Sequence, residues 1–261
     1  MDYNELLNLH KYLVAEVKAA YRDAQKLNTH EVEKKELNDI ATFTDRYMEK
    51  RIVEAIGKLY PDHRFIGEEY GESDSQSRYD WLIDPIDGTI NYAAGIPMFG
   101  TSVALREDGE AIYGLIIDWP NDKVYYGIKG HGAFCEDEPI HVSANSHLDE
   151  AVATICLTSS YDEHYMNEAL DTVRKLHPHL RGIRIIVCTV YELIWLASGL
   201  TDIMLNIRAS IGISSCAGKL IVQEAGGRVS NLQGQPRAQK DTLLITNGLL
   251  HDEVVKIING L

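Results

Sequence analysis

Trp81-Leu82-Ile83-Asp84-Pro85-Ile86-Asp87-Gly88-Thr89 is the stretch that decides the fold of this chain. A short apolar run, typical of a buried strand, ends there in two aspartates. Pro85 fixes its own φ and favours an extended Asp84, while Gly88 permits a backbone geometry that a Cβ resists. Two acidic side chains three positions apart on a stiff loop suit a hard divalent cation. The amides of Gly88 and Thr89 can open a helix whose N-terminus receives a phosphate.

A second acidic motif, Phe65-Ile66-Gly67-Glu68-Glu69, repeats this order of apolar residues, a glycine and acids. Glu68 precedes Asp84 by an interval long enough for a loop that returns to the same place. Clustered carboxylates without a cation or a basic partner repel one another. We therefore expect Glu68, Asp84 and Asp87 to surround a bound cation.

The two motifs together resemble the inositol monophosphatase family, the magnesium-dependent, lithium-sensitive phosphomonoesterases. The resemblance extends from about Asn38 to Asn247. It implies an α/β protein that forms a five-layered αβαβα sandwich. Residues 1–145 are expected to form an α+β N-terminal lobe with the metal and phosphate motifs. Residues 146–261 are expected to form a C-terminal α/β lobe that contributes the substrate pocket, and the family also implies a homodimer.

The resemblance also implies the metal ligands and the catalytic residues. Glu68, Asp84, Asp87 and the carbonyl of Ile86 are expected to bind Mg²⁺, of which the family uses two or three ions. Mn²⁺ is a possible substitute and Li⁺ an inhibitor. Asp45, which the sequence alone would make a partner of a helix dipole, is expected to orient the attacking water with Thr89. The catalytic set is thus Asp45, Thr89 and Glu68.

Four residues are expected to contact the substrate. Gly88 and Thr89 would bind the phosphate through their amides. Lys34 matches a family lysine that reaches toward the site, although Lys35 is one position away and a solvated charge run explains both equally well. Arg208 brings a positive charge near the substrate, and the alternative is a surface or dimer-contact arginine.

The second half of the chain departs from the family pattern in two places. The family usually supplies a last metal ligand from a Trp-Asp pair before Glu-Ala-Gly-Gly, and here those two positions are Ile213 and Ser214. A serine hydroxyl is a weaker, neutral ligand than a carboxylate. The family also places small residues at the substrate turn, whereas this chain has Val187-Cys188-Thr189-Val190.

The sequence therefore predicts a phosphatase for a small, inositol-monophosphate-like metabolite, in which water is activated by Mg²⁺ and the second metal site is weakened. One alternative substrate is a sugar bisphosphate or a nucleotide 3′-phosphate, with Arg208 at the second phosphate. The other alternative is a non-catalytic relative that binds a phosphorylated ligand.

Composition narrows the possible partners. The chain has 261 residues, a net charge of −14 and a pI near 5.1. This argues against a nucleic-acid groove or an anionic membrane surface, since both need clustered Lys and Arg. No signal-peptide pattern is present, and no apolar run approaches the ~20 residues of a membrane helix. We expect a cytoplasmic protein whose partner is a small phosphorylated metabolite, and we assign its four cysteines no chemistry.

Hydrophobic periodicity predicts the order of elements. An amphipathic helix is expected over residues 4–27 and a second one up to Leu59, with Thr44 as its N-cap. An antiparallel meander follows, with strands over 101–105, 112–118 and 123–128. The second half alternates: strands are expected at 151–157, 183–187, 202–207 and 243–246, and helices at 163–176, 190–198, 214–224 and 252–258.

Overall fold

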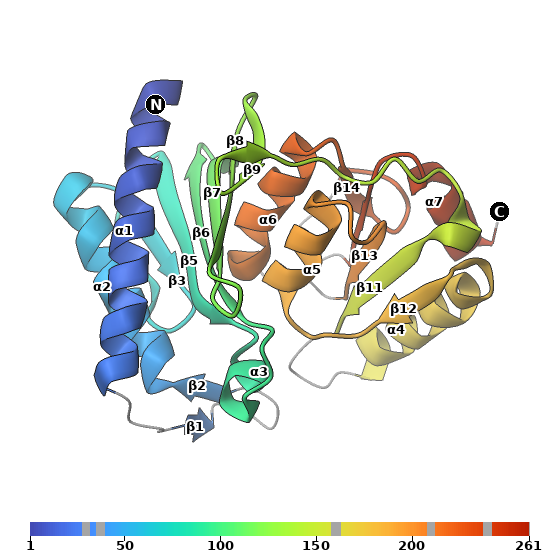
Figure 1. Cartoon of the computed structure of the whole chain (residues 1–261), viewed down its shortest axis with the longest axis horizontal. Helices are drawn as coiled ribbons and strands as arrows, with labels where there is room; N and C mark the ends of the chain where they lie inside the picture. Colours follow the sequence, from blue (N-terminus) through green and yellow to red (C-terminus); the bar gives the residue numbers. More distant parts are fainter. Residues whose placement is uncertain (28–31, 35–39, 158–162, 208–211, 237–241, 261) are drawn as a thin grey trace.

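Five layers of secondary structure stack side by side in this chain (Figure 1). The computed structural model describes residues 1–27, 32–34, 40–157, 163–207, 212–236 and 242–260. The first layer contains the helices α1 (Tyr3–Leu27) and α2 (Phe43–Leu59), the third contains α5 (Thr189–Ala197) and α6 (Ile213–Glu224), and the fifth contains α4 (Glu163–Leu176) and α7 (His251–Asn259).

Two sheets separate these helical layers. The spatial order in the eight-stranded sheet is β10 (Glu138–Pro139), β9 (Gly132–Cys135), β8 (Lys123–Ile128), β7 (Glu110–Asp118), β6 (Gly100–Glu107), β5 (Tyr79–Asp87), β3 (Arg64–Gly67) and β4 (Gly71–Glu72). In the five-stranded sheet it is β12 (Gly182–Arg184), β11 (Val152–Cys156), β13 (Ile203–Asn206), β15 (Leu243–Thr246) and β14 (Arg228–Asn231). A small ladder joins β1 (Val32–Lys34) to β2 (Ile40–Thr42), and α3 (Thr89–Ala94) follows β5 directly.

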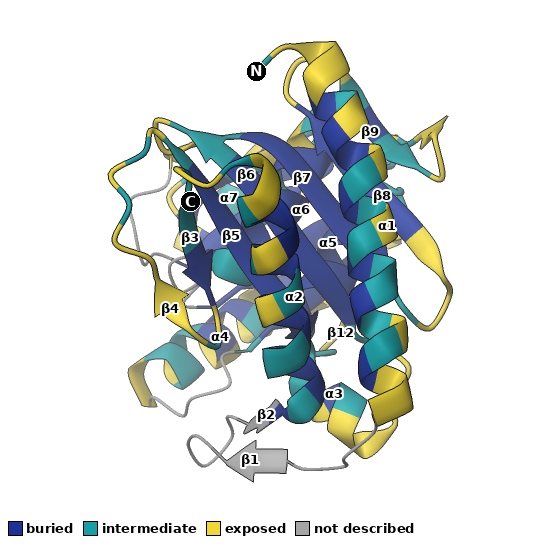
Figure 2. Cartoon of the chain, turned by 90° about the vertical axis from the view of Figure 1, so that its left-hand side faces the viewer, coloured by how far each residue is buried: buried dark blue, intermediate teal, exposed yellow. Residues whose placement is uncertain are grey.

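Three apolar cores hold the layers together. The first lies between α1, α2 and the large sheet, and Figure 2 shows that the sheet-facing sides of both helices are buried and their outer sides exposed. The second lies between the two sheets and surrounds α5 and α6, and the third joins the small sheet to α4 and α7. The expected αβαβα sandwich is therefore confirmed. Since α5 and α6 are packed on both sides, the residues at their N-termini are firmly placed.

A β-bulge in β5 decides where the two aspartates point. Asp84 pairs with Ser102 and Asp87 with Gly100, so β5 has one residue more than β6 over this interval. Residues three apart in a regular strand face opposite sides of the sheet, but one extra residue returns them to the same side. Pro85 suits the bulge because it has no N–H for the ladder. Its carbonyl accepts a hydrogen bond of 2.6 Å from the buried Thr101 hydroxyl.

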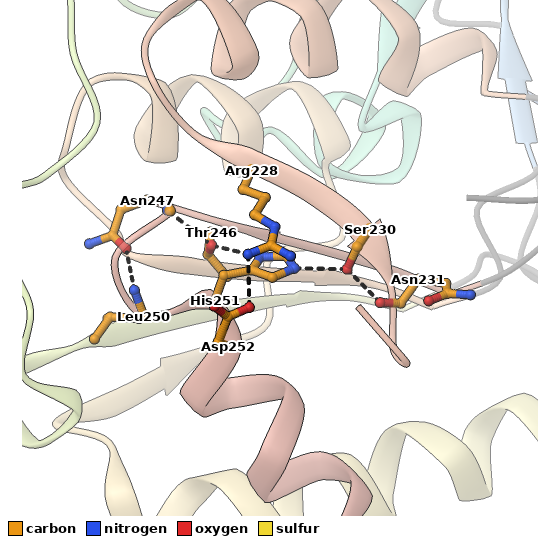
Figure 3. Close-up of polar contacts among 9 residues, drawn as sticks. Arg228, Ser230, Asn231, Thr246, Asn247, Leu250, His251 and Asp252 are labelled. Carbon is orange, nitrogen blue, oxygen red and sulfur yellow. Dashed lines mark hydrogen bonds and ion pairs between the residues drawn. The ribbon is translucent and has the colours of Figure 1, made fainter. Parts of the chain in front are cut away.

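A buried histidine links the small sheet to the last helix (Figure 3). Ser230 donates its proton to the carbonyl of Asn231, so the Nε2–H of His251 donates to Ser230 at 2.9 Å. The Nδ1 of His251 then accepts from Thr246 at 3.0 Å. Burial, followed by the nearby Arg228, lowers the pKa of His251 to about 4. The network therefore requires a neutral imidazole.

Most expected elements form within a few residues of their predicted bounds, with three differences. The N-cap of α2 is Thr42 and not Thr44, because Thr42 and Asp45 form a capping box. The strand expected over 183–187 ends at Arg184, and Val187 has a left-handed φ of 57°. The edge strands β1, β2, β4, β10 and β14 are too short or too polar to stand out in the sequence.

Candidate active site

The carboxyl group of Asp84 lies at the centre of the site, between the large sheet and α6. It hydrogen-bonds with the carboxyl of Glu68 and with the hydroxyl of Ser214, and only 1% of the residue is exposed. Burial, followed by the charge of Asp87, raises the pKa of Asp84 to about 8. The structure thus brings together two of the three acidic side chains that are expected to bind metal, and Ser214 lies beside them.

Asp87 points from the same bulge to the N-terminus of α5. Its Oδ2 accepts hydrogen bonds from the amide of Val190 at 2.7 Å and from the thiol of Cys188 at 3.1 Å. Burial raises the pKa of Asp87 to about 6, although these donors act in the opposite direction. The N-terminus of a helix favours a carboxylate. Asp87 therefore connects the large sheet to α5, a contact that the sequence analysis did not predict.

Asp45 approaches the site from the first turn of α2. Its Oδ2 accepts from the amide of Thr42 at 2.9 Å and from the Thr42 hydroxyl, and its Oδ1 lies 3.4 Å from the hydroxyl of Thr89. Burial raises the pKa of Asp45 to about 6. The hydroxyl of Thr89 also donates to the carbonyl of Ile86 at 2.9 Å. The expected pair of Asp45 and Thr89 is thus close in space, and its catalytic role stays a prediction.

Gly88 cannot be replaced without a collision at this site. Its φ is 83°, and a Cβ would lie 2.8 Å from the carbonyl oxygen of Met98 and 3.0 Å from the sulfur of Cys188. Only glycine accepts both the conformation and the close approach. Gly88 therefore allows α3 to begin directly after β5, against Met98 and Cys188.

The donor atoms here suit a hard cation. Asp84 Oδ1 is buried and has no hydrogen-bond partner among the described residues, so an ion would satisfy it. The carbonyl of Ile86 has two lone pairs, of which Thr89 uses one. As they stand, however, no three His, Cys, Asp or Glu side chains within the described ranges are placed to hold an ion. Asp87 is engaged by α5, and Asp84 contacts Glu68 and Ser214, so a cation would have to displace these contacts.

The side chains of two expected substrate contacts are not among the parts that the structure describes. Arg208 is in a segment that the structure does not describe, and of Lys34 only the backbone, in β1, is described. The substrate turn is described and differs from a small-residue turn. Val187 is a β-branched residue at positive φ, which costs about 1 to 2 kcal/mol relative to glycine, and its side chain is only partly buried.

Sequence reasoning missed two buried acids near the site. Glu49 on α2 binds the backbone of the loop that carries Glu68. Glu192 on α5 is fully buried, and burial, followed by the charge of Asp87, raises its pKa well above the usual range. Both residues look like ordinary charged positions on a helix in the sequence. The helical period assigns both positions to the buried face, and an acid on that face is the sequence feature that could have pointed to them.

The geometry defines a site of acidic residues and hydroxyls at the end of a strand, and comparison with known proteins identifies its class. The model of the inositol monophosphatase family matches residues 2–260. A fructose-1,6-bisphosphatase/inositol-1-monophosphatase of Thermotoga maritima is 36% identical over 87% of this chain and 86% of its own. A protein of the same name from Aquifex aeolicus is 33% identical over 96% of both chains.

Solved structures agree in fold. The extragenic suppressor protein suhB of Bartonella henselae covers 97% of this chain and 98% of its own, with a TM-score of 0.88 and 26% identity. An IMPase of Thermotoga maritima covers 95% and 96%, with a TM-score of 0.81 and 32% identity. The chain belongs to the inositol monophosphatase family, and it is a phosphatase of this type that acts on phosphate monoesters. No helix among the described residues is long and apolar enough to span a membrane.

Proposed function

We propose that this protein hydrolyses the phosphate monoester of a small, inositol-monophosphate-like metabolite with the help of Mg²⁺. The observation that carries the proposal is the buried carboxyl group of Asp84, whose Oδ1 lacks a partner among the described residues and which has the acidic side chains of Glu68 and Asp87 as neighbours. Such a group is unfavourable without a positive charge. A divalent cation and the phosphate that it attracts would supply the missing partners.

The residues of the chain divide the work. A bound Mg²⁺, coordinated by Glu68, Asp84 and the carbonyl of Ile86, would offset phosphate charge and make water more acidic. Asp45 and Thr89 lie 3.4 Å apart and would share the attacking water, with Asp45 accepting its proton. The amides of Gly88 and Thr89 would donate to the phosphate oxygens.

Further residues complete the proposed site. Lys34 and Arg208 would add positive charge at the substrate. Mn²⁺ is expected to replace Mg²⁺, and Li⁺ is expected to inhibit. We also propose a homodimer located in the cytoplasm, with the substrate pocket contributed mainly by residues 146–261.

A second cation should bind weakly. Ser214 lies beside Asp84 where the family has a carboxylate, so a cation between Asp84 and Asp87 has one negative charge fewer. Asp87 is also engaged by Val190 and Cys188. The missing carboxylate at position 214 and the engagement of Asp87 each lower the affinity for a second ion. We therefore expect slow turnover or a preference for a different substrate. Saturation of two ions at submillimolar Mg²⁺ would refute this part.

The test is phosphate release from a panel of phosphorylated metabolites, with Mg²⁺ or Mn²⁺, for the wild type and for Asp84→Asn. We expect cation-dependent release that the variant loses, while its fold, measured by circular dichroism, is kept. Equal rates for both proteins would refute the proposal. Ligand binding that depends on Mg²⁺ without hydrolysis of any panel member would instead favour a non-catalytic, ligand-binding relative.

A sugar bisphosphate is the second candidate substrate, with a nucleotide 3′-phosphate as a related possibility. The names of the Thermotoga maritima and Aquifex aeolicus relatives include fructose-1,6-bisphosphatase activity. In this case Arg208 would bind the second phosphate. Arg208→Ala should then reduce kcat/KM for bisphosphates more than for monophosphates, and equal losses would count against this reading.

A further inference from the structure

The loop that carries Glu68 is fastened at both ends by contacts from other elements. On one side the amide of Glu68 donates to the carbonyl of Ile83 at 3.2 Å, directly before Asp84 in β5. On the other side the next two amides, of Glu69 and Tyr70, donate to the two carboxylate oxygens of Glu49 at 2.8 and 3.0 Å. The backbone is thus attached at Glu68 itself and at the two residues that follow it.

Glu49 is placed for this contact by the geometry of α2. It lies one helical turn after Asp45, so the two residues share a face of the helix. Only 1% of Glu49 is exposed. Two successive amides that converge on a carboxylate form an anion-binding concavity, which gives a buried negative charge the donors it needs. One face of α2 therefore supplies Asp45 to the site and Glu49 to the loop beside it.

The absence of a side chain at Gly67 leaves the space that the Glu49 carboxylate occupies. A Cβ at position 67 would lie 1.9 Å from Oε1 of Glu49 and 2.4 Å from its carboxyl carbon. No real contact is this short, so any side chain here must expel the Glu49 carboxylate. The φ of Gly67 lies outside the left-handed range, so steric contact rather than backbone conformation requires a glycine here.

We propose that Glu49 is a positioning residue that sets the affinity of the site for its divalent cation by fixing the loop of Glu68. The inference rests on the proposed function, because Glu68 must bind the ion. Glu49 is not one of the residues proposed to bind the ion, and its effect passes through the amides of Glu69 and Tyr70. Partners that orient metal ligands in this way typically change metal affinity 10- to 100-fold when they are mutated.

The experiment measures the thermal midpoint of the full chain against Mg²⁺ concentration, without substrate. The readout, called the half-point below, is the Mg²⁺ concentration at which the site is half occupied. It is obtained by fitting the stabilisation to RT ln(1 + c/Kd), where c is the Mg²⁺ concentration, a function that rises without a plateau. Glu49→Gln keeps the shape but places an N–H₂ group against one of the two amides, and we expect its half-point to rise about 10-fold or more. Glu54→Gln, on the exposed side of the same helix, is the matched control and should stay within twofold of the wild type.

Gly67→Ala provides a second, independent test. In the wild-type background it should raise the half-point like Glu49→Gln, because the new methyl group expels the carboxylate. In the background of Glu49→Ala the collision is absent, so Gly67→Ala should add little. Additive effects of the two substitutions would overturn the assigned contact.

The outcomes separate the two claims. If the wild type responds to Mg²⁺, Glu68→Gln abolishes the response and Glu49→Gln leaves the half-point within twofold, only the positioning role is refuted. A lower midpoint in Glu49→Gln without a change in half-point also refutes it, since a purely structural role gives that result. If Mg²⁺ does not stabilise the wild type, the metal site itself is refuted and the inference with it.

Discussion

Substitution of Ser214 by aspartate should destabilise the metal-free protein and raise its affinity for Mg²⁺. Ser214 is the first-turn residue of α6 that hydrogen-bonds with Asp84. A carboxylate there lies beside Asp84, and a second negative charge at this partly buried position should cost roughly 1 to 3 kcal/mol. For a chain of this size each 1 kcal/mol lowers the midpoint by about 2 to 4 °C. We therefore expect a decrease of several degrees without metal.

When Mg²⁺ is added, the effect of Ser214→Asp on the thermal midpoint should change from destabilising to stabilising. A unit charge at about 4 Å attracts another with ~4 kcal/mol at an effective dielectric constant of 20. Even if desolvation cancels most of this attraction, about 1.4 kcal/mol remains, which is tenfold in affinity. The assay is again the thermal midpoint against Mg²⁺ concentration, together with phosphate release. Ser215→Asp, a buried position one residue away, is the control and should only destabilise.

Two results would refute this reasoning. If Ser214→Asp lowered the midpoint by the same amount with and without Mg²⁺, position 214 would not face the cation. If the wild type and the variant showed the same half-point and the same rate, the serine would not be what weakens the second site.

Three further predictions concern the framework of the site. Gly88→Ala should lose most of the activity, and it should lose more unfolding free energy than Gly95→Ala. Both glycines have a positive φ, but only position 88 lacks space for a Cβ. Equal losses of unfolding free energy in urea would contradict this. Thr101→Val leaves the Pro85 carbonyl and the Trp119 indole N–H unpaired and should lower the free energy of unfolding by about 2 to 4 kcal/mol. Thr154→Val removes a hydroxyl that has no partner among the described residues, so its effect on the free energy of unfolding should be nearly neutral. His251 has a pKa of about 4 in the folded state against 6.5 in the unfolded state. Its contribution to the free energy of unfolding is therefore complete above pH 6.5 and decreases by up to about 3 kcal/mol as the pH falls to 4. The difference in unfolding free energy between wild type and His251→Gln should shrink over that interval, and a constant difference would refute the neutral network.

The sequence predicted the sandwich and the approximate bounds of most elements, because long helices and meander strands carry strong periodic patterns. It also placed Asp84 and Asp87 together at one cation site, but it attributed this to a stiff loop. The structure attributes it to a bulge, which depends on the pairing of β5 with β6 and cannot be read from residues 81–89 alone. A local pattern can thus predict which side chains meet without predicting how.

Contacts between elements far apart in the chain were beyond sequence reasoning. Asp87 binds the N-terminus of α5 through Val190, and Glu49 binds the loop after β3. Each partner is an ordinary backbone amide, so no residue type marks it. The capping of α2 by Thr42 was missed for a related reason, since Thr42 and Thr44 are equivalent by composition and only the backbone conformation distinguishes them.

The most direct test of the central claim is calorimetric titration of Mg²⁺ into the wild type and into Asp84→Asn, without substrate. We predict a saturable binding isotherm for the wild type and at least a 10-fold weaker one for the variant. Indistinguishable isotherms, or no binding heat for the wild type at millimolar Mg²⁺, would contradict the account.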